Sequence, residues 1–402
     1  MERFKISENV EAVLNPVDEL DITSVVIFSE NGSVTDNGKA GLTNLSLHVG
    51  LKRSVSKTTK EIAFLTEPYG SSIIPETGKD FSTISFQITP DGFPVFIEVL
   101  SELITEPAFT EEDFIIEKET TIAAIRARLE SAFSFGYEEF NLFTYKNTPY
   151  KNLPSGTVET VVPITLNDLK EKYRRFFNEG KFIISIAGKI PENVEKLLSK
   201  LPIKGGKNRK LLFKTPIEKS ESVNLCRKGS TQTFIIRGYE APSVNDWKKY
   251  VSYKLLNTVV GDGFNSILFQ QLREKQGLAY STGSFFPTLK NPGRFVIYIG
   301  TSPEKEEQAL KGIDNLIENL PALIGEEDIN RAKNYLKGTY LLDHEKRLRK
   351  AWYYGWWTVL TGTPEKDTQY IEEIESLTLK DVKEAAEELS KKPYHQVIVC
   401  NG

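Results

Sequence analysis

Residues 164–170 read Ile-Thr-Leu-Asn-Asp-Leu-Lys, and residues 377–383 read Leu-Thr-Leu-Lys-Asp-Val-Lys. A Gly-Thr pair lies upstream of each copy, at 156–157 and at 362–363. Each copy leads into a helical stretch and then into an apolar run that ends at a glycine. Self-similarity of this kind is typical of a duplicated structural unit. The chain of 402 residues is therefore predicted to contain two homologous units of about 200 residues.

Each predicted unit mixes strands with helices. Ile84, Phe86 and Ile88 alternate with polar residues, which indicates a half-buried strand. Thr110 precedes three acidic residues and resembles the capping box of a long helix that runs to about Glu130. In the second half, we expect strands over 233–236 and 295–299, and helices over 246–259, 304–319 and 326–350. The mixture predicts an α+β fold in which helices pack on largely antiparallel sheets.

A polar segment rich in turn-forming residues separates the two halves. Residues 202–219 contain two prolines, two adjacent glycines and several Lys and Arg residues. We therefore predict an N-terminal domain over 1–201, a linker over 202–219 and a C-terminal domain over 220–402. A linker of this kind would let two like domains face each other around a cleft.

Charge and cysteine content exclude several classes of protein. Lys and Arg total 51 against 55 Asp and Glu, a net charge of −4 that argues against a nucleic-acid partner. Two cysteines, Cys226 and Cys400, are too few for a disulfide scaffold or a cysteine-rich zinc module, and we expect packed thiols. No stretch resembles a signal peptide or a transmembrane helix, which predicts a cytoplasmic protein without a membrane partner. A single Met beside abundant Lys and Glu is typical of thermophile proteins.

The segment 261–285 carries the most specific motif in the chain. It contains a Gly-rich turn, then Ser266 and Leu268-Phe269, then Leu-Arg-Glu-Lys-Gln-Gly-Leu-Ala-Tyr-Ser from Leu272 to Ser281. This segment resembles the pitrilysin/insulinase family of zinc metallopeptidases, the inverzincins, and especially its bacterial branch similar to mitochondrial processing peptidase. Landmarks of the first half fit as well, so the resemblance covers the whole chain. It implies two homologous domains that together form half of a clamshell.

The zinc motif of that family is degenerate in this sequence. The resemblance places H-x-x-E-H over 44–48, where this chain has Asn44, Leu47 and His48, and places the distal glutamate ligand at Ala124. Asn is a poor zinc ligand, and neither Leu nor Ala is a ligand. Leu47 also lacks the carboxylate of the general base. We therefore expect no metal or other cofactor in this chain, and a structural or surface role for His48.

The second half retains a pair of residues that the resemblance makes functional. Arg273 and Tyr280 have the seven-residue spacing of the family's Arg/Tyr pair. The resemblance implies that Tyr280 helps to stabilise a developing oxyanion near the scissile bond, and that Arg273 holds an adjacent substrate carbonyl. The alternative is that Arg273 is a solvated helix charge and Tyr280 an aromatic residue at a sheet edge.

Together these features predict a subunit that is inactive alone. A paralogous partner with an intact H-x-x-E-H motif would supply zinc in a heterodimer, and this chain would supply Arg273 and Tyr280 in trans to a peptide or unfolded protein substrate. The competing hypothesis is a purely structural or peptide-binding scaffold without a proteolytic role. A third reading, a self-sufficient homodimeric peptidase, is the weakest because the ligands are missing.

Overall fold

The computed structural model describes residues 1–17, 20–207, 211–229 and 231–401. The chain forms two compact units, each built from three stretches of sequence. The first unit comprises Met1–Arg126, Asn152–Leu211 and Leu342–Asp367. The second unit comprises Ala127–Lys151, Leu212–Leu341 and Thr368–Gly402. None of the helices in the described ranges is both long enough and apolar enough to cross a membrane.

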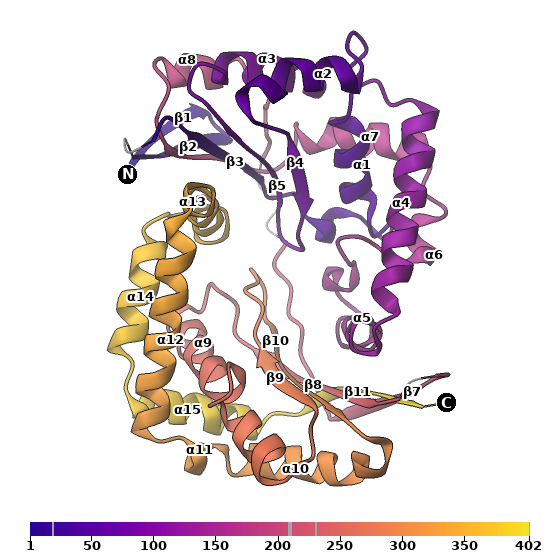
Figure 1. Ribbon diagram of the computed structural model, residues 1–402, viewed down its shortest axis with the longest axis vertical. Coiled ribbons are helices and arrows are strands. Elements are labelled where there is room, and N and C mark those ends of the chain that lie inside the picture. The colour runs from indigo at the N-terminus through magenta and orange to yellow at the C-terminus, as the bar shows by residue number, and fades with distance from the viewer. Residues whose placement is uncertain (18–19, 208–210, 230, 402) are drawn as a thin grey trace. The chain divides into compact units, whose positions relative to one another are not determined.

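A six-stranded sheet forms the centre of the first unit (Figure 1). Its strands are β1 (Glu2–Ser7), β2 (Val10–Pro16), β3 (Thr23–Ser29), β4 (Ile74–Thr77), β5 (Ser82–Ile88) and β6 (Phe182–Gly188). Their order across the sheet is β1-β2-β6-β3-β5-β4, and only β2 and β6 are parallel neighbours. β3 and β6 are buried along their whole length, and the centre of β3 is the apolar run Val25–Phe28.

A five-stranded sheet forms the centre of the second unit. Its strands are β7 (Glu221–Arg227), β8 (Thr233–Ala241), β9 (Ser281–Phe285), β10 (Gly293–Thr301) and β11 (Tyr394–Asn401). Their order is β7-β11-β8-β10-β9, with β7 and β11 as the parallel pair. When β1 is set aside, the first sheet has the same order: the first strand, then the fifth, second, fourth and third. The shared topology confirms the prediction of two α+β halves with largely antiparallel sheets.

Helices fill the connections between the strands. Those of the first half are α1 (Leu42–Gly50), α2 (Thr59–Thr66), α3 (Phe93–Thr105), α4 (Glu111–Leu129), α5 (Ala132–Thr144), α6 (Val158–Val161), α7 (Leu166–Phe176) and α8 (Val194–Leu198). Those of the second half are α9 (Trp247–Gly261), α10 (Glu306–Glu318), α11 (Leu320–Leu323), α12 (Glu326–Glu345), α13 (Arg347–Thr361), α14 (Lys366–Ser376) and α15 (Leu379–Ser390). Single turns of 3₁₀ helix are η1 (Ser33–Thr35), η2 (Glu67–Tyr69), η3 (Pro149–Lys151) and η5 (Pro303–Lys305), and η4 (Phe269–Lys275) is a π-helix.

The sequence repeat marks the start of equivalent helices. Thr165 caps α7 and Thr378 caps α15, and each threonine forms a capping box with an aspartate three residues later. Each helix then leads into the last strand of its sheet, β6 or β11. The repeated residues are therefore helix-start signals that the two halves share.

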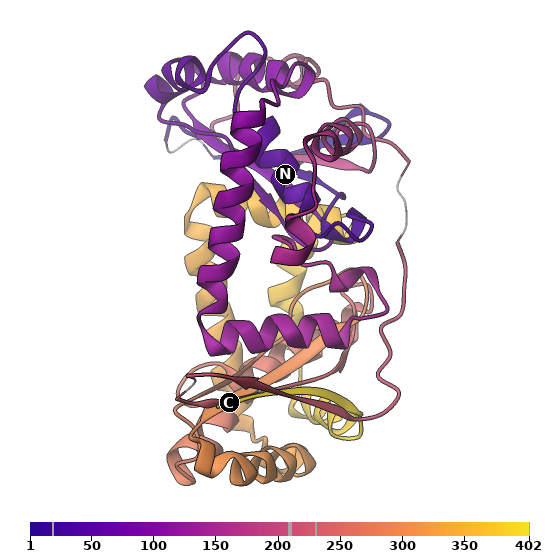
Figure 2. The ribbon, with the colours of Figure 1, turned by 90° about the vertical axis from the view of Figure 1, so that its right-hand side faces the viewer.

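Each half of the sequence contributes one helix to the unit that is built around the sheet of the other half. α5 follows α4 of the first half but packs on β8 and β11 of the second sheet (Figure 2). α13 follows α12 of the second half but packs on β3 and β6 of the first sheet. A glycine in each helix permits the close approach: a Cβ at Gly136 would meet Val399 at 2.7 Å, and one at Gly355 would meet Phe28 at 2.3 Å.

This exchange changes two predictions. The predicted helix over 326–350 is wrong, because Lys346 is extended, with φ −85° and ψ 126°, and separates α12 from α13. The predicted boundaries 1–201 and 220–402 differ from the observed units by the exchanged stretches 127–151 and 342–367. The chain changes unit after Leu211, within the predicted linker 202–219, of which residues 208–210 lie outside the described residues.

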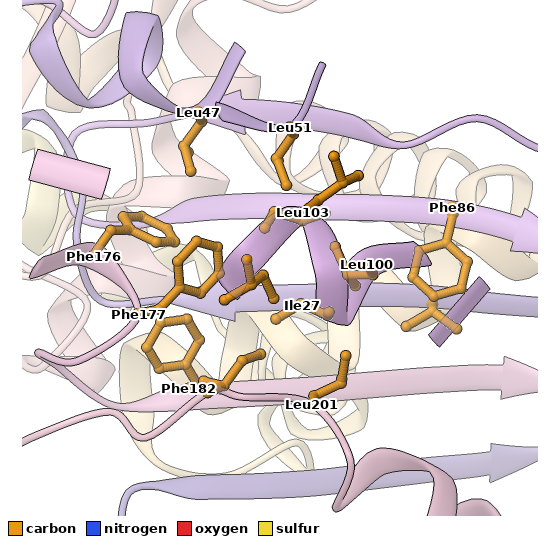
Figure 3. Close-up of a cluster of buried hydrophobic side chains, with 14 of the residues drawn as sticks. Ile27, Leu47, Leu51, Phe86, Leu100, Leu103, Phe176, Phe177, Phe182 and Leu201 are labelled. Atoms are coloured by element: carbon orange, nitrogen blue, oxygen red, sulfur yellow. The ribbon is translucent and has the colours of Figure 1, made fainter. Parts of the chain in front are cut away.

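Each unit has its own hydrophobic core. The larger cluster joins the first sheet to α1, α3 and α7, with Ile27, Leu47, Leu103 and Phe176 among its buried members (Figure 3). In the second unit, Phe140 of α5 packs against Ile236, Val296, Val397 and Val399 of the sheet. The exchanged helix α5 therefore contributes directly to the core of the second unit.

Candidate functional site

Helix α1, which carries three of the predicted metal-site positions, begins at a tightly held turn. Gly41 has φ 92°, and a Cβ there would lie 2.8 Å from the carbonyl oxygen of Ser155, so the position requires glycine. The buried Asp36 carboxylate accepts hydrogen bonds from the backbone N–H of Gly41 and of Thr43, both at 3.1 Å. Burial raises the pKa of Asp36, and Lys172 at 3.4 Å opposes that rise. These contacts fix the start of α1 and hence the direction of its side chains.

The side chains of α1 divide between the core and the surface. Leu47 is only 1% exposed and points into the hydrophobic cluster of the first unit (Figure 3). Asn44 and His48 are half-buried and lie one helical turn apart, on the same face. The predicted general-base position therefore holds an aliphatic side chain that belongs to the core.

Among the described residues, helix α4 places one carboxylate near His48 but does not complete a metal site. The Oε1 atom of Glu117 lies 3.7 Å from Nδ1 of His48. Ala124, at the position of the distal ligand, lies two turns further along α4 and is exposed. In the described part of the chain, no group of three or more His, Cys, Asp or Glu residues is placed to hold a metal ion.

A pocket of about 310 Å³ adjoins this part of α1. Its walls come from α1, α2, η2, the following loop, β4 and α4, and its lining residues are His48, Leu51, Lys52, Thr59, Ile62, Ala63, Thr66, Glu67, Ser71, Ser72, Ile73, Pro75 and Glu117. β4 is the edge strand of the first sheet, and its outer side pairs with no strand in the described ranges. The degenerate site therefore lies between a mixed polar and apolar hollow and an open sheet edge.

The predicted Arg/Tyr pair lies in the second unit, between α9 and β9. Arg273 is exposed on the π-helix η4, with its guanidinium carbon 4.9 Å from the ring centre of Phe269. Tyr280 directly precedes the edge strand β9, is 60% exposed and donates its backbone N–H to Gly300 at 2.9 Å. Among the described residues, neither the Arg273 guanidinium nor the Tyr280 hydroxyl has a hydrogen-bond partner. Both groups are therefore available to a ligand.

Part of the chain matches a known protein family, and most of it matches curated relatives. The family model described as peptidase M16 inactive domain matches residues 163–336. An "Uncharacterized zinc protease" of Rickettsia felis is 26% identical over 338 residues, which cover 83% of this chain and 81% of that protein. The chain is therefore similar to peptidase M16 proteins. These similarities confirm the predicted resemblance to the pitrilysin/insulinase family of zinc metallopeptidases.

Two further M16-related proteins match nearly the whole chain. A "Non-peptidase homolog YmxG" of Helicobacter pylori is 26% identical over 374 residues, which cover 88% of this chain and 83% of that protein. The crystal structure of a peptidase M16 inactive domain from Pseudomonas fluorescens superposes with a TM-score of 0.89 at 19% identity. That superposition covers 100% of this chain and 98% of the other, so the fold is shared over the full length.

The residues at the M16 metal positions do not fit a catalytic zinc ion. Such a site needs three protein ligands, and of the four positions only His48 offers a conventional one. Leu47 is embedded in the core, and Ala124 carries a methyl group. Glu117 near His48 was missed from the sequence, because the sequence separation of the two residues gives no sign of their contact. A His/Glu pair is still short of the three protein ligands that a catalytic zinc ion needs.

Proposed function

We propose that this chain is the non-catalytic subunit of a heteromeric zinc metallopeptidase of the processing-peptidase type. One observation carries the proposal: the metal positions keep only His48 as a conventional ligand, whereas Arg273 and Tyr280 remain exposed, with no hydrogen-bond partner for either side chain among the described residues. A paralogous subunit with an intact H-x-x-E-H motif supplies zinc and the general base. The name of the Helicobacter pylori relative, a non-peptidase homolog, supports the absence of an independent activity.

Tyr280 and Arg273 act on the substrate backbone in the partner's site. The Tyr280 hydroxyl donates to the carbonyl oxygen at the scissile bond, where negative charge develops. Arg273 donates to a neighbouring carbonyl and holds the peptide in register. Donors aimed at a developing oxyanion typically contribute about 2–4 kcal/mol to transition-state stabilisation.

The first unit contributes a place for the peptide chain. The open edge of β4 offers unpaired backbone groups, with which an extended peptide pairs as an added strand. The adjoining pocket has apolar walls at Ile62 and Ile73 and charged groups at Lys52 and Glu117, which suits side chains of mixed character. This arrangement favours unfolded segments over folded proteins as substrates.

The test is reconstitution with an H-x-x-E-H paralogue from the same genome, followed by a peptidase assay. Tyr280→Phe is expected to lower kcat about 10²-fold with unchanged assembly, because it removes one hydroxyl that acts in the transition state. Arg273→Ala should weaken both peptide binding and turnover, and Arg273→Lys should recover part of the binding because it restores the charge but not the planar fork. Tyr335→Phe is the matched control, since Tyr335 is also exposed, at 46%, but lies on α12.

Metal content separates the two subunits. Elemental analysis should find zinc in the partner and none bound stoichiometrically to this chain. About one tightly bound zinc ion per purified chain, together with chelator-sensitive cleavage, would contradict the proposal. If the complex forms and both Tyr280→Phe and Arg273→Ala retain full activity, the scaffold hypothesis replaces it.

A further inference from the structure

The two cysteines of the chain lie opposite each other on neighbouring strands of the second sheet. Cys226 is on β7 and Cys400 is on β11, and the two are register partners in the parallel pair. Their Sγ atoms are 3.7 Å apart, although 174 positions separate them in the sequence. A disulfide joins two sulfur atoms at about 2.05 Å, so a modest side-chain rotation brings these atoms within bonding distance.

Both thiols lie on the face of the sheet opposite the cluster that contains α5. Gln396 and Ser222 are register partners four residues earlier on the same strands, and Nε2 of Gln396 donates to Oγ of Ser222 at 3.2 Å. Because side chains alternate along a strand, the cysteines share the face of that hydrogen bond. Val399 of β11 lies on the other face, in the cluster that contains α5. Cys226 is exposed and Cys400 is partly buried, so a reagent reaches Cys226 first.

We propose that Cys226 and Cys400 form an oxidisable dithiol site that a low-molecular-weight disulfide converts to an intrachain disulfide. The Cys226 thiolate attacks one sulfur of the reagent, forms a mixed disulfide and releases one small thiol. The Cys400 thiolate then attacks the Cys226 sulfur and displaces the second small thiol. The two cysteines together lose two electrons, the reagent gains them, and the two cysteine protons end on the released thiols.

The order of the two attacks follows from the surroundings of each sulfur. Burial raises the pKa of the Cys400 thiol, and the nearby Cys226 thiol contributes to the rise. Cys400 is thus the weaker first nucleophile at neutral pH and the natural second one, since its target is then 3.7 Å away. No other cysteine is present to compete for the mixed disulfide.

The bond would tie the last strand of the chain to an edge strand. β7 forms one edge of the second sheet, and β11 is its inner neighbour. The bond would close a long loop and therefore restrict the unfolded chain, which stabilises the unit. Arg273 and Tyr280 precede β9, at the opposite edge of the same sheet, so the inference does not depend on the proposed peptidase role.

The experiment uses the full chain, reduced and freed of reductant, then incubated with oxidised glutathione. Thiol titration should fall from two per chain to none, and digestion without reduction should release one cross-linked peptide pair that contains Cys226 and Cys400. The chain should remain uncross-linked to other copies. The midpoint temperature of thermal unfolding of the second unit should rise by about 5 °C or more, and a reducing agent should reverse the change.

Single variants distinguish an internal disulfide from ordinary surface reactivity. Cys400→Ser should stop at a glutathione adduct on Cys226, and Cys226→Ser should react far more slowly. The proposal is overturned if the unmodified chain also stops at the adduct, if it links to a second copy through Cys226, or if both thiols stay free. The measurements on the unmodified chain decide the question even if a serine variant fails to fold.

Discussion

The two units use the same strand order but place different chemistry on the same connection. In the first unit, the segment between the second and third strands of the repeat carries Asn44, Leu47 and His48 on α1. In the second unit, the equivalent segment between β8 and β9 carries Arg273 and Tyr280. In the first segment, the buried Leu47 and the neutral Asn44 occupy positions where the family motif has a general base and a metal ligand. In the second segment, Arg273 and Tyr280 remain as exposed hydrogen-bond donors.

This difference shows which parts of a duplicated fold are constrained. The centres of buried strands such as β3 and β6 must remain largely apolar on both faces, because helices cover them. The connection after the second strand only has to begin and end near the sheet, so its exposed residues are free to change. The functional side chains on this connection can therefore be lost or retained without any change in the order of the strands.

The largest effect is expected where the lost motif has become part of the core. Leu47→Glu should lower the free energy of unfolding of the first unit by about 3–5 kcal/mol, since it buries a carboxylate among apolar side chains. Asn44→His should change it by less than about 0.5 kcal/mol, because Asn44 is half-buried at the surface of α1. Urea unfolding, followed by probes in each unit, measures both values.

Leu47→Met serves as the control of similar volume and should cost less than about 1.5 kcal/mol. If Leu47→Glu is as stable as the parent chain, residue 47 faces the pocket and not the core. In that case the metal positions could be restored without repacking the core. The statement that the motif position has become part of the core of the first unit would then be wrong.

The exchanged helices provide the next largest effect. Gly355→Ala should destabilise the first unit by about 1–3 kcal/mol, because its methyl group would overlap the buried ring of Phe28. Gly136→Ala should destabilise the second unit by less, since the methyl ends of Val399 and Ile236 yield more easily than a ring. Gly338→Ala is the matched control: it lies in α12 with nothing within 4 Å of the added methyl, so it should stabilise by about 0.5–1 kcal/mol.

Each substitution should destabilise the unit on which its helix packs: Gly355→Ala the first unit and Gly136→Ala the second. If Gly355→Ala moves only the unfolding transition of the second unit, α13 is not docked on the first sheet. If Gly355→Ala stabilises the chain as much as Gly338→Ala does, α13 is not closely packed on the sheet.

Local sequence signals located several of the helices and strands correctly. Strict alternation identified β5, and helical spacing with a capping threonine identified α4. The exchange of α5 and α13 was not predicted, because period and propensity do not show which sheet a helix covers. A signal was nevertheless present: residues 133–137 and 352–356 share an aromatic-x-aromatic-Gly-aromatic pattern, and the glycine is the point of contact with the sheet.

The candidate site was predictable in its positions but not in its surroundings. The motif placed Asn44, Leu47, His48 and Ala124, yet nothing in it indicated that Leu47 joins the core. The pocket beside His48 and the approach of Glu117 depend on how α2, α4 and β4 fold around α1. Such contacts arise from packing over long sequence separations, which local patterns do not record.

Acid should affect the second unit through His395 on β11. Burial and, to a smaller extent, the nearby Arg294 charge together lower the pKa of His395 to about 4. The unfolded chain takes up a proton near pH 6.5, whereas the folded chain resists it to about pH 4, so stability is full above pH 6.5 and declines as the pH falls towards 4. The expected loss is about 1–2 kcal/mol, measured by urea unfolding between pH 7 and pH 4.

His395→Gln keeps a polar partner for Thr144 of α5, which lies 3.0 Å from Nδ1 of His395. The variant should remove this part of the pH dependence while it leaves the stability at pH 7 close to that of the parent. An unchanged acid profile would show that carboxylates, and not His395, set the acid limit of the second unit.

The smallest effect tests whether the repeated residues perform the same task in both units. Thr165 accepts from the backbone N–H of Asp168 at 3.2 Å, and Thr378 accepts from that of Asp381 at 3.3 Å. Each aspartate in turn accepts from the N–H of its threonine, at 3.0 Å and 2.8 Å. Thr165→Ala should therefore cost the first unit about 1 kcal/mol and Thr378→Ala should cost the second unit the same, while Thr339→Ala, in the interior of α12, should change neither. Unfolding transitions that shift by equal amounts in opposite units would show that the repeat preserves a helix cap. If only one of the two substitutions lowers the free energy of unfolding, the threonine of the other copy does not stabilise its helix by capping.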